Sequence, residues 1–128
     1  KRRCGWFDAV LVGQSIAING ITDVVLTKLD VLDELEEIQV CVGYEAKHKK
    51  YNYLPFDENI QNILMPIYET IPGWQESTFG LTSWDDLPKK AQNYISFLES
   101  KIQKNISIIS TGPDRAHTID RNNLLGNN

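Results

Sequence analysis

The order of apolar and polar positions predicts two long helices in this chain. From Ala9 to Ile18 apolar residues fall on nearly every side of a helix, so we expect this helix to be buried. Asp8 can cap its first turn, and Asn19-Gly20 can end it. We expect a second helix from Pro88, which suits a first turn, to Asn105. Its apolar residues recur at helical spacing and predict one buried stripe, formed by Ala91, Tyr94, Ile95, Leu98 and Ile102.

Shorter apolar segments predict strands. The expected strands span residues 22–27, 37–44, 51–54, 66–71 and 106–109. Residues 47–50, which read Lys-His-Lys-Lys, are expected to form the solvated tip of a hairpin between the second and third strands. Alternation of strands and helices indicates an α/β fold with a mixed, mainly parallel sheet flanked by helices. The 37–54 segment is then a β-hairpin excursion from that sheet.

Composition narrows the class of protein. The chain has 128 residues, of which 41% are hydrophobic, enough for one compact domain with a core. Its net charge of −4 argues against nonspecific binding to nucleic acid or anionic membranes, and no segment approaches the ~20 apolar residues of a membrane helix. Cys4 and Cys41 lack metal-ligand spacing and are interpreted as reduced, buried thiols of a cytosolic protein, with a disulfide left open. Because the chain starts Lys1-Arg2-Arg3 and not with Met, we expect a piece of a longer protein.

The tetrapeptide Thr27-Lys28-Leu29-Asp30 directly follows the β-branched run 24–26. A carboxylate just past the end of a buried strand can accept hydrogen bonds from the ring N–H and the exocyclic amino group of guanine. Adenine has no matching pair of donors, so such an arrangement selects guanine nucleotides. The Lys28 stem can lie along the flat face of the base. An alternative is that Asp30 only caps a helix through residues 31–34.

A second loop, Ser110-Thr111-Gly112-Pro113, follows the apolar run 106–109. In guanine-nucleotide sites built on parallel sheets, two such loops close around one base. Gly112 permits close approach of the backbone to a ligand, and amide groups there could meet the guanine carbonyl oxygen. By itself this segment is equally well an ordinary transition from strand to turn. The two loops together favour the base-holding half of a GTP site.

Four segments resemble the C-terminal part of the adenylosuccinate synthetase family and occur in the family's order. They are residues 2–10 (RRCGWFDAV), 26–33 (LTKLDVLD), 66–74 (PIYETIPGW) and 109–115 (ISTGPDR). Residues 46–64 and those after Ala116 diverge, so nothing is transferred to them. The resemblance implies a fold related to P-loop nucleotide-binding proteins. It also implies one unit over 1–128, the C-terminal guanine-nucleotide-binding portion of a longer synthetase, with 116–128 as a divergent tail.

The resemblance further implies a GTP-dependent ligase that makes adenylosuccinate from IMP and L-aspartate, releasing GDP and phosphate in AMP biosynthesis. The implied GTP-binding residues are Arg2, Lys28, Leu29, Asp30, Ser110, Thr111 and Gly112. Lys1 and Arg2 would end an Arg-rich loop over the aspartate substrate; guanidinium groups suit carboxylates and phosphates. The intact enzyme is expected to be a cytoplasmic homodimer that uses Mg²⁺, without nucleic-acid or membrane partners.

The family's phosphate loop, Mg²⁺ ligand and catalytic residues belong to an N-terminal region, so we expect no catalytic or metal-binding residue in this chain and no activity of the chain alone. The alternatives are a non-catalytic guanine-nucleotide-binding domain and a purely structural one. Several residues that could suggest chemistry are given a structural interpretation. Asp33 and Glu34 are expected to serve the turn and solvent, His48 to be solvated, His117 to have no catalytic role, and Trp6, Trp74 and Trp84 to anchor packing.

Overall fold

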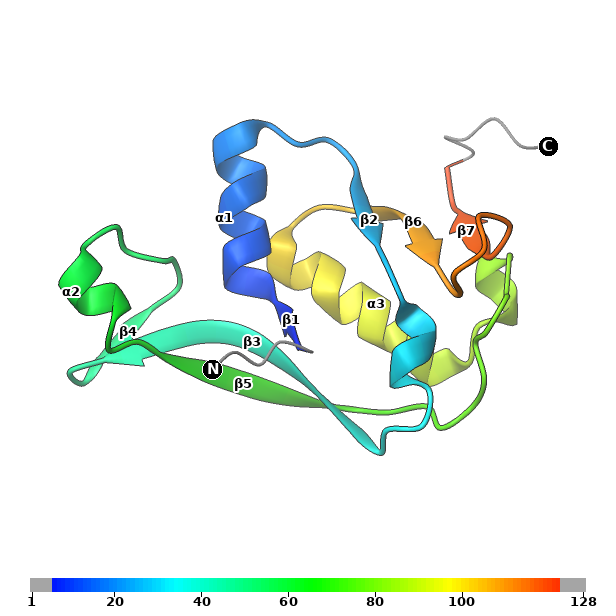
Figure 1. Ribbon diagram of the computed structural model, residues 1–128, viewed down its shortest axis with the longest axis horizontal. Coiled ribbons are helices and arrows are strands. Elements are labelled where there is room, and N and C mark those ends of the chain that lie inside the picture. The colour runs from blue at the N-terminus through cyan, green and yellow to red at the C-terminus, as the bar shows by residue number, and fades with distance from the viewer. Residues whose placement is uncertain (1–5, 123–128) are drawn as a thin grey trace.

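The structure is a computed structural model and describes residues 6–122. Its elements are β1 (Phe7–Asp8), α1 (Ala9–Asn19), β2 (Val24–Leu26), the 3₁₀ helix η1 (Leu29–Leu32), β3 (Glu37–Ala46), β4 (Lys49–Tyr51), α2 (Glu58–Gln61), β5 (Met65–Pro72), the 3₁₀ helix η2 (Trp84–Asp86), α3 (Lys89–Ile102), β6 (Ile106–Ser110) and β7 (Thr118–Asp120). The strands form two sheets, and α3 lies between them (Figure 1).

The mixed α/β fold is confirmed, but the proportion of parallel strands is lower than predicted. In one sheet β3 pairs parallel with β1 and antiparallel with β4 and β5; in the other, β6 pairs parallel with β2 and antiparallel with β7. Among the described residues, two pairs are therefore parallel and three antiparallel. One reason is the short turn from β3 to β4, because such a turn can join only antiparallel strands. The strands β1 and β7 and the helix η2 were not predicted.

The hairpin tip is shorter than the predicted one. Lys47 and His48 both adopt positive φ, at 52° and 67°, and together make the turn. Two successive residues of this conformation match the twist of the flanking strands, as in a two-residue hairpin loop. The return strand therefore begins at Lys49, and not at Tyr51. Both residues of the tip are exposed, as predicted for His48.

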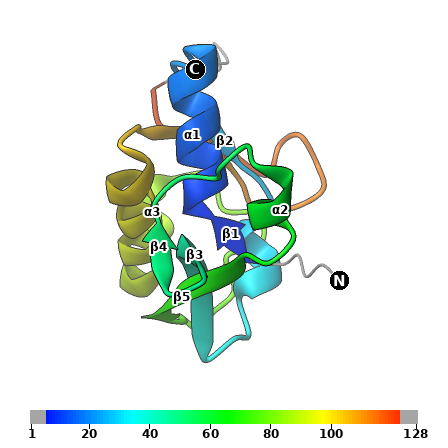
Figure 2. The ribbon, with the colours of Figure 1, turned by 90° about the vertical axis from the view of Figure 1, so that its left-hand side faces the viewer.

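Helix α1 begins and ends as predicted, with the Asp8 carboxylate accepting from the amide of Leu11 at 3.0 Å and Gly20 ending the helix at φ 65°. The expected burial on all sides is wrong. Leu11 is 51% exposed and Ile18 is 64% exposed. The physical reason is that α1 packs on α3 and β3, and this contact covers one side of the helix (Figure 2).

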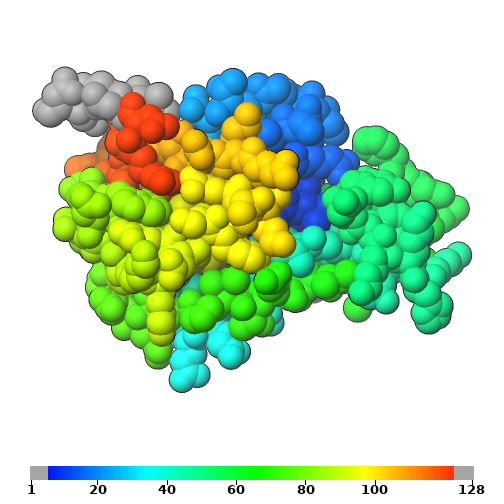
Figure 3. All heavy atoms as spheres, turned by 180° about the vertical axis from the view of Figure 1, so that it is seen from behind, coloured from blue at the N-terminus to red at the C-terminus, as the bar shows by residue number. Residues whose placement is uncertain are grey.

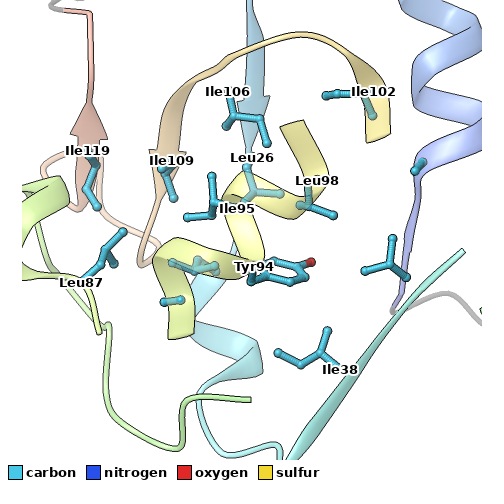
Figure 4. Close-up of a cluster of buried hydrophobic side chains, with 14 of the residues drawn as sticks. Leu26, Ile38, Leu87, Tyr94, Ile95, Leu98, Ile102, Ile106, Ile109 and Ile119 are labelled. Atoms are coloured by element: carbon cyan, nitrogen blue, oxygen red, sulfur yellow. The ribbon is translucent and has the colours of Figure 1, made fainter. Parts of the chain in front are cut away.

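Helix α3 provides the centre of the core through the predicted stripe, all five residues of which are buried. Figure 4 shows side chains of this stripe meeting Leu26 of β2, Ile109 of β6 and Ile38 of β3. One helix thus packs against both sheets. Its opposite, polar face is the part of α3 visible from behind the molecule (Figure 3).

Candidate functional site

The two predicted loops leave the same edge of one sheet. Strands β2 and β6 are parallel neighbours, and Leu26 lies opposite Ile109 in their register. The chain therefore leaves the two strands side by side, at Thr27 after β2 and directly after Ser110 of β6. We call residues 27–30 the Lys28 loop and residues 110–113 the Gly112 loop. The carboxyl ends of adjacent parallel strands are where α/β proteins commonly bind ligands.

Lys28 has an unusual backbone conformation. Its φ and ψ are 59° and 41°, in the left-handed region that side chains other than glycine rarely adopt. The next residue, Leu29, is 1% exposed and belongs to the core, so it fixes the chain in this conformation. The Lys28 side chain is exposed. Strained residues held in place by a well-packed neighbour are a feature of binding sites.

The carboxylates of Asp30 and Asp33 are in different situations, although only three positions separate them. Asp30 lies inside η1, whose N-cap is Lys28, and its side chain makes no hydrogen bond or ion pair with any residue in the described range. The helix-capping alternative for Asp30 is therefore not what the structure contains. Asp30 lines a surface hollow of about 700 Å³, shared with residues 75–77 and Phe79. An acceptor without a protein donor is available to a ligand.

Asp33, by contrast, is fully engaged within the protein. Its Oδ1 accepts from Trp74 Nε1 at 2.8 Å and from Thr78 Oγ1 at 2.7 Å, and its Oδ2 accepts from the Thr78 amide at 2.7 Å. The predicted solvent role of Asp33 is wrong, because these bonds tie the segment 74–78 to η1 beside Asp30. Trp74 is buried in the core, as predicted for a packing anchor. The local sequence pattern does not predict these hydrogen bonds.

The Gly112 loop is anchored by Thr111. This residue is fully buried; its Oγ1 donates to the Leu81 carbonyl at 2.8 Å, and its own carbonyl accepts from the Gly80 amide at 3.1 Å. Ser110 Oγ donates to the Gly112 carbonyl at 3.1 Å. The Gly112 amide has no acceptor among residues 6–122. The loop thus presents one free N–H donor beside the loop that carries the free Asp30 carboxylate.

Lys1 and Arg2, predicted to belong to an aspartate-binding loop, lie outside the described residues, as does Cys4. Within 6–122, no group of three His, Cys, Asp or Glu residues could hold a metal ion. None of the described helices is both long and apolar enough to cross a membrane.

A second cluster of titratable groups joins β1 to β3 and is structural. The Tyr44 hydroxyl donates to Asp8, whose carboxylate also caps α1. Burial, and next the Asp8 hydrogen bond, raise the pKa of Tyr44. Burial and the nearby Asp8 charge raise the pKa of the Cys41 thiol, which is free. Cys41 is buried, as predicted, and a protonated, buried thiol is a poor nucleophile.

Replacing Lys28 by glycine tests whether its backbone is strained for function. Glycine adopts positive φ without strain, so we expect Lys28→Gly to leave stability unchanged or raise it by up to about 1 kcal/mol while weakening nucleotide binding. Gln103→Gly is the matched control, since Gln103 has φ 57° at the end of α3, outside the site. Thermal unfolding should change alike in both variants, and only Lys28→Gly should raise the Kd of the complete protein for the guanine nucleotide that the sequence predicts. Equal Kd values in the two variants would show that Lys28 is not part of the site.

Comparisons with known proteins identify the family of this chain. A family model described as adenylosuccinate synthetase matches residues 1–119. The adenylosuccinate synthetase of Ehrlichia canis (strain Jake) is 51% identical over 123 residues, which are 96% of this chain and 28% of the relative. That of Coxiella burnetii is 52% identical over 120 residues, 94% of this chain and 28% of the relative. The fully ligated adenylosuccinate synthetase from Plasmodium falciparum aligns with a TM-score of 0.84 and 36% identity, covering 93% of this chain and 29% of that structure.

The sheets, the connecting helix and these likenesses define a mixed α/β protein related in fold to P-loop nucleotide-binding proteins. The family match covers most of the chain. The chain belongs to the adenylosuccinate synthetase family. It spans 28% of the length of the curated relatives that it matches.

Proposed function

We propose that this chain is the guanine-binding portion of an adenylosuccinate synthetase, the GTP-dependent ligase that joins IMP and L-aspartate. The free Asp30 carboxylate carries this assignment. It lies in the loop after β2, beside the loop after β6 that offers the free Gly112 amide. Asp30 would accept from the ring N–H and amino group of guanine, and Gly112 would donate to the 6-oxygen. The Lys28 stem would cover the face of the base.

The remaining predicted residues take supporting roles in this proposal. Leu29 and Thr111 hold the two loops, since both side chains are buried, and Ser110 holds the Gly112 carbonyl. Arg2 would reach the nucleotide, and Lys1 and Arg2 would contact the aspartate substrate. We assign the Mg²⁺ ligands and the catalytic residues to the part of the synthetase outside this sequence. The complete enzyme would be a cytoplasmic homodimer without nucleic-acid or membrane partners.

A chimeric enzyme tests the proposal. In the Coxiella burnetii synthetase, this chain would replace the segment to which 120 of its residues align. We expect the chimera to form adenylosuccinate from IMP and L-aspartate with GTP, and poorly with ATP, because adenine lacks the donor pair that Asp30 reads. The chain alone should give no product. A folded chimera that uses ATP as well as GTP would refute guanine recognition, and turnover by the chain alone would refute the division of roles.

A further inference from the structure

His117 fills the inside of the Gly112 loop. If Gly112 carried a Cβ atom, that atom would lie 3.0 Å from His117 Cγ and still closer to Nδ1. Real side chains do not approach so closely, so the imidazole occupies the space that only glycine leaves open at this position. The ring therefore packs directly against the Gly112 backbone.

Hydrogen bonds join His117 to Thr111 in the loop and to Asp114 directly after it. Its carbonyl accepts from the Thr111 amide at 2.9 Å, and its amide donates to the Asp114 carbonyl at 2.8 Å. The Asp114 amide also donates a hydrogen bond to the ring nitrogen Nδ1 at 3.4 Å. The segment from Thr111 to His117 is thus a turn closed by one residue.

The outer side of the ring is held by a segment that also borders Asp30. Phe79 packs on His117 with ring centroids 4.8 Å apart and planes inclined by 58°. Phe79 is 56% exposed and lines the same hollow as Asp30. The segment that contains Phe79 is tied to η1 by the Thr78 bonds to Asp33. A continuous set of contacts therefore runs from the Lys28 loop through Phe79 and His117 to Gly112.

We propose that His117 is a positioning residue for guanine specificity. Its imidazole holds the Gly112 amide where that amide can donate to the 6-oxygen of the base, while Asp30 reads the ring N–H and the amino group. This inference rests on the proposed function and adds to it the residue that places the donor. His117 touches neither the reacting atoms nor the base, and acts through Gly112.

Two variants in a complete synthetase that carries this chain separate the contributions of the ring. His117→Phe keeps an aromatic ring but removes the acceptor, whereas His117→Asn supplies a side-chain oxygen that can accept from the Asp114 amide. GTP is compared with 6-thioguanosine triphosphate, in which a poorly accepting sulfur replaces the 6-oxygen, and with inosine triphosphate, which lacks the 2-amino group. His48→Asn is the matched control, because His48 is exposed in the hairpin tip.

We expect His117→Phe to raise the KM for GTP about tenfold and to reduce the preference for GTP over the 6-thio analogue by a similar factor, as loss of one hydrogen bond implies. The preference for GTP over inosine triphosphate should not change, because Asp30 reads the 2-amino group. The KM values for IMP and L-aspartate and kcat should also stay unchanged. His117→Asn should show a smaller rise in the KM for GTP and a smaller loss of preference for GTP over the 6-thio analogue than His117→Phe. His48→Asn should behave as the parent enzyme does.

Three outcomes would overturn the inference. One is a His117→Phe enzyme with the parent's preference for GTP over the 6-thio analogue. Another is an equal rise in all three KM values, which would indicate a general structural role. If His117→Phe does not fold, His117→Asn is the deciding variant, because it also lacks the ring. A His117→Asn enzyme with the parent's preference for GTP over the 6-thio analogue would refute positioning by the ring. A parent enzyme without preference for GTP over ATP would instead refute the proposed function.

Discussion

Replacing Asp30 by asparagine in a complete synthetase is expected to lower kcat/KM for GTP. The expected loss of transition-state stabilisation is about 1–3 kcal/mol or more. The amide that replaces one carboxylate oxygen is a donor, and it would face a donor of guanine without an acceptor between them. Xanthosine triphosphate carries a 2-oxygen in place of the amino group, and this oxygen can accept from the new amide. The variant should therefore shift its preference towards xanthosine triphosphate, as measured by kcat/KM for each nucleotide.

Glu34→Gln is the matched control for that experiment. Glu34 is exposed and lines the same hollow as Asp30, so the change removes one negative charge close to the site without touching the proposed base contact. We expect this enzyme to keep the parent's preference for GTP. If Asp30→Asn and Glu34→Gln rank the two nucleotides alike, the Asp30 carboxylate does not read the base.

The largest effect on stability is expected for Gly73→Ala. A Cβ atom at Gly73 would collide with the Leu35 carbonyl group, whose carbon would be 2.9 Å away. The colliding atoms are backbone and cannot rotate aside. The Gly73 amide donates to the Glu36 carbonyl at 2.8 Å, and the adjacent Trp74 is buried, so the segment cannot move away freely. We expect a loss of about 3 kcal/mol or more in the free energy of unfolding, seen as a lower Tm and poor soluble yield.

Gly13→Ala should raise the free energy of unfolding, and it serves as the control for Gly73→Ala. Gly13 lies inside α1, and the added Cβ would find its nearest neighbour, the Ile102 Cα, at an ordinary 3.8 Å. Alanine in a helix interior is favoured over glycine by about 0.5–1 kcal/mol. A Gly73→Ala protein that melts at the parent temperature would show that β3 and β5 can separate at this end without cost.

Local patterns predicted most of the elements, because their causes lie within a few residues. The buried stripe of α3 follows from helical spacing alone, and the Asp8 and Gly20 ends of α1 follow from capping chemistry. The exposure of Leu11 and Ile18 could not be predicted in this way, since an apolar helix does not reveal which of its sides has a partner. The short strand β7 depends on pairing with β6 and has little signal of its own.

The site was predicted in part. The sequence places Asp30 and Gly112 after apolar strands, and the structure adds that β2 and β6 are parallel neighbours in register. The Asp33 contacts with Trp74 and Thr78 span 41 and 45 positions of sequence, so no pattern could predict them. The packing of His117 on Phe79 likewise depends on the fold. The binding roles of all these residues stay predictions, and Lys1 and Arg2 also lie outside the described residues.

The position of α3 between the two sheets couples the stability of one sheet to that of the other. Its inner stripe contacts Ile38 on one side and Ile109 on the other, so neither sheet can detach without exposing the same side chains to water. Opening of the long hairpin would therefore loosen the distant rim where β2 and β6 end. Substitutions on the inward face of β3 are therefore expected to destabilise both sheets together, because both pack on the same helix.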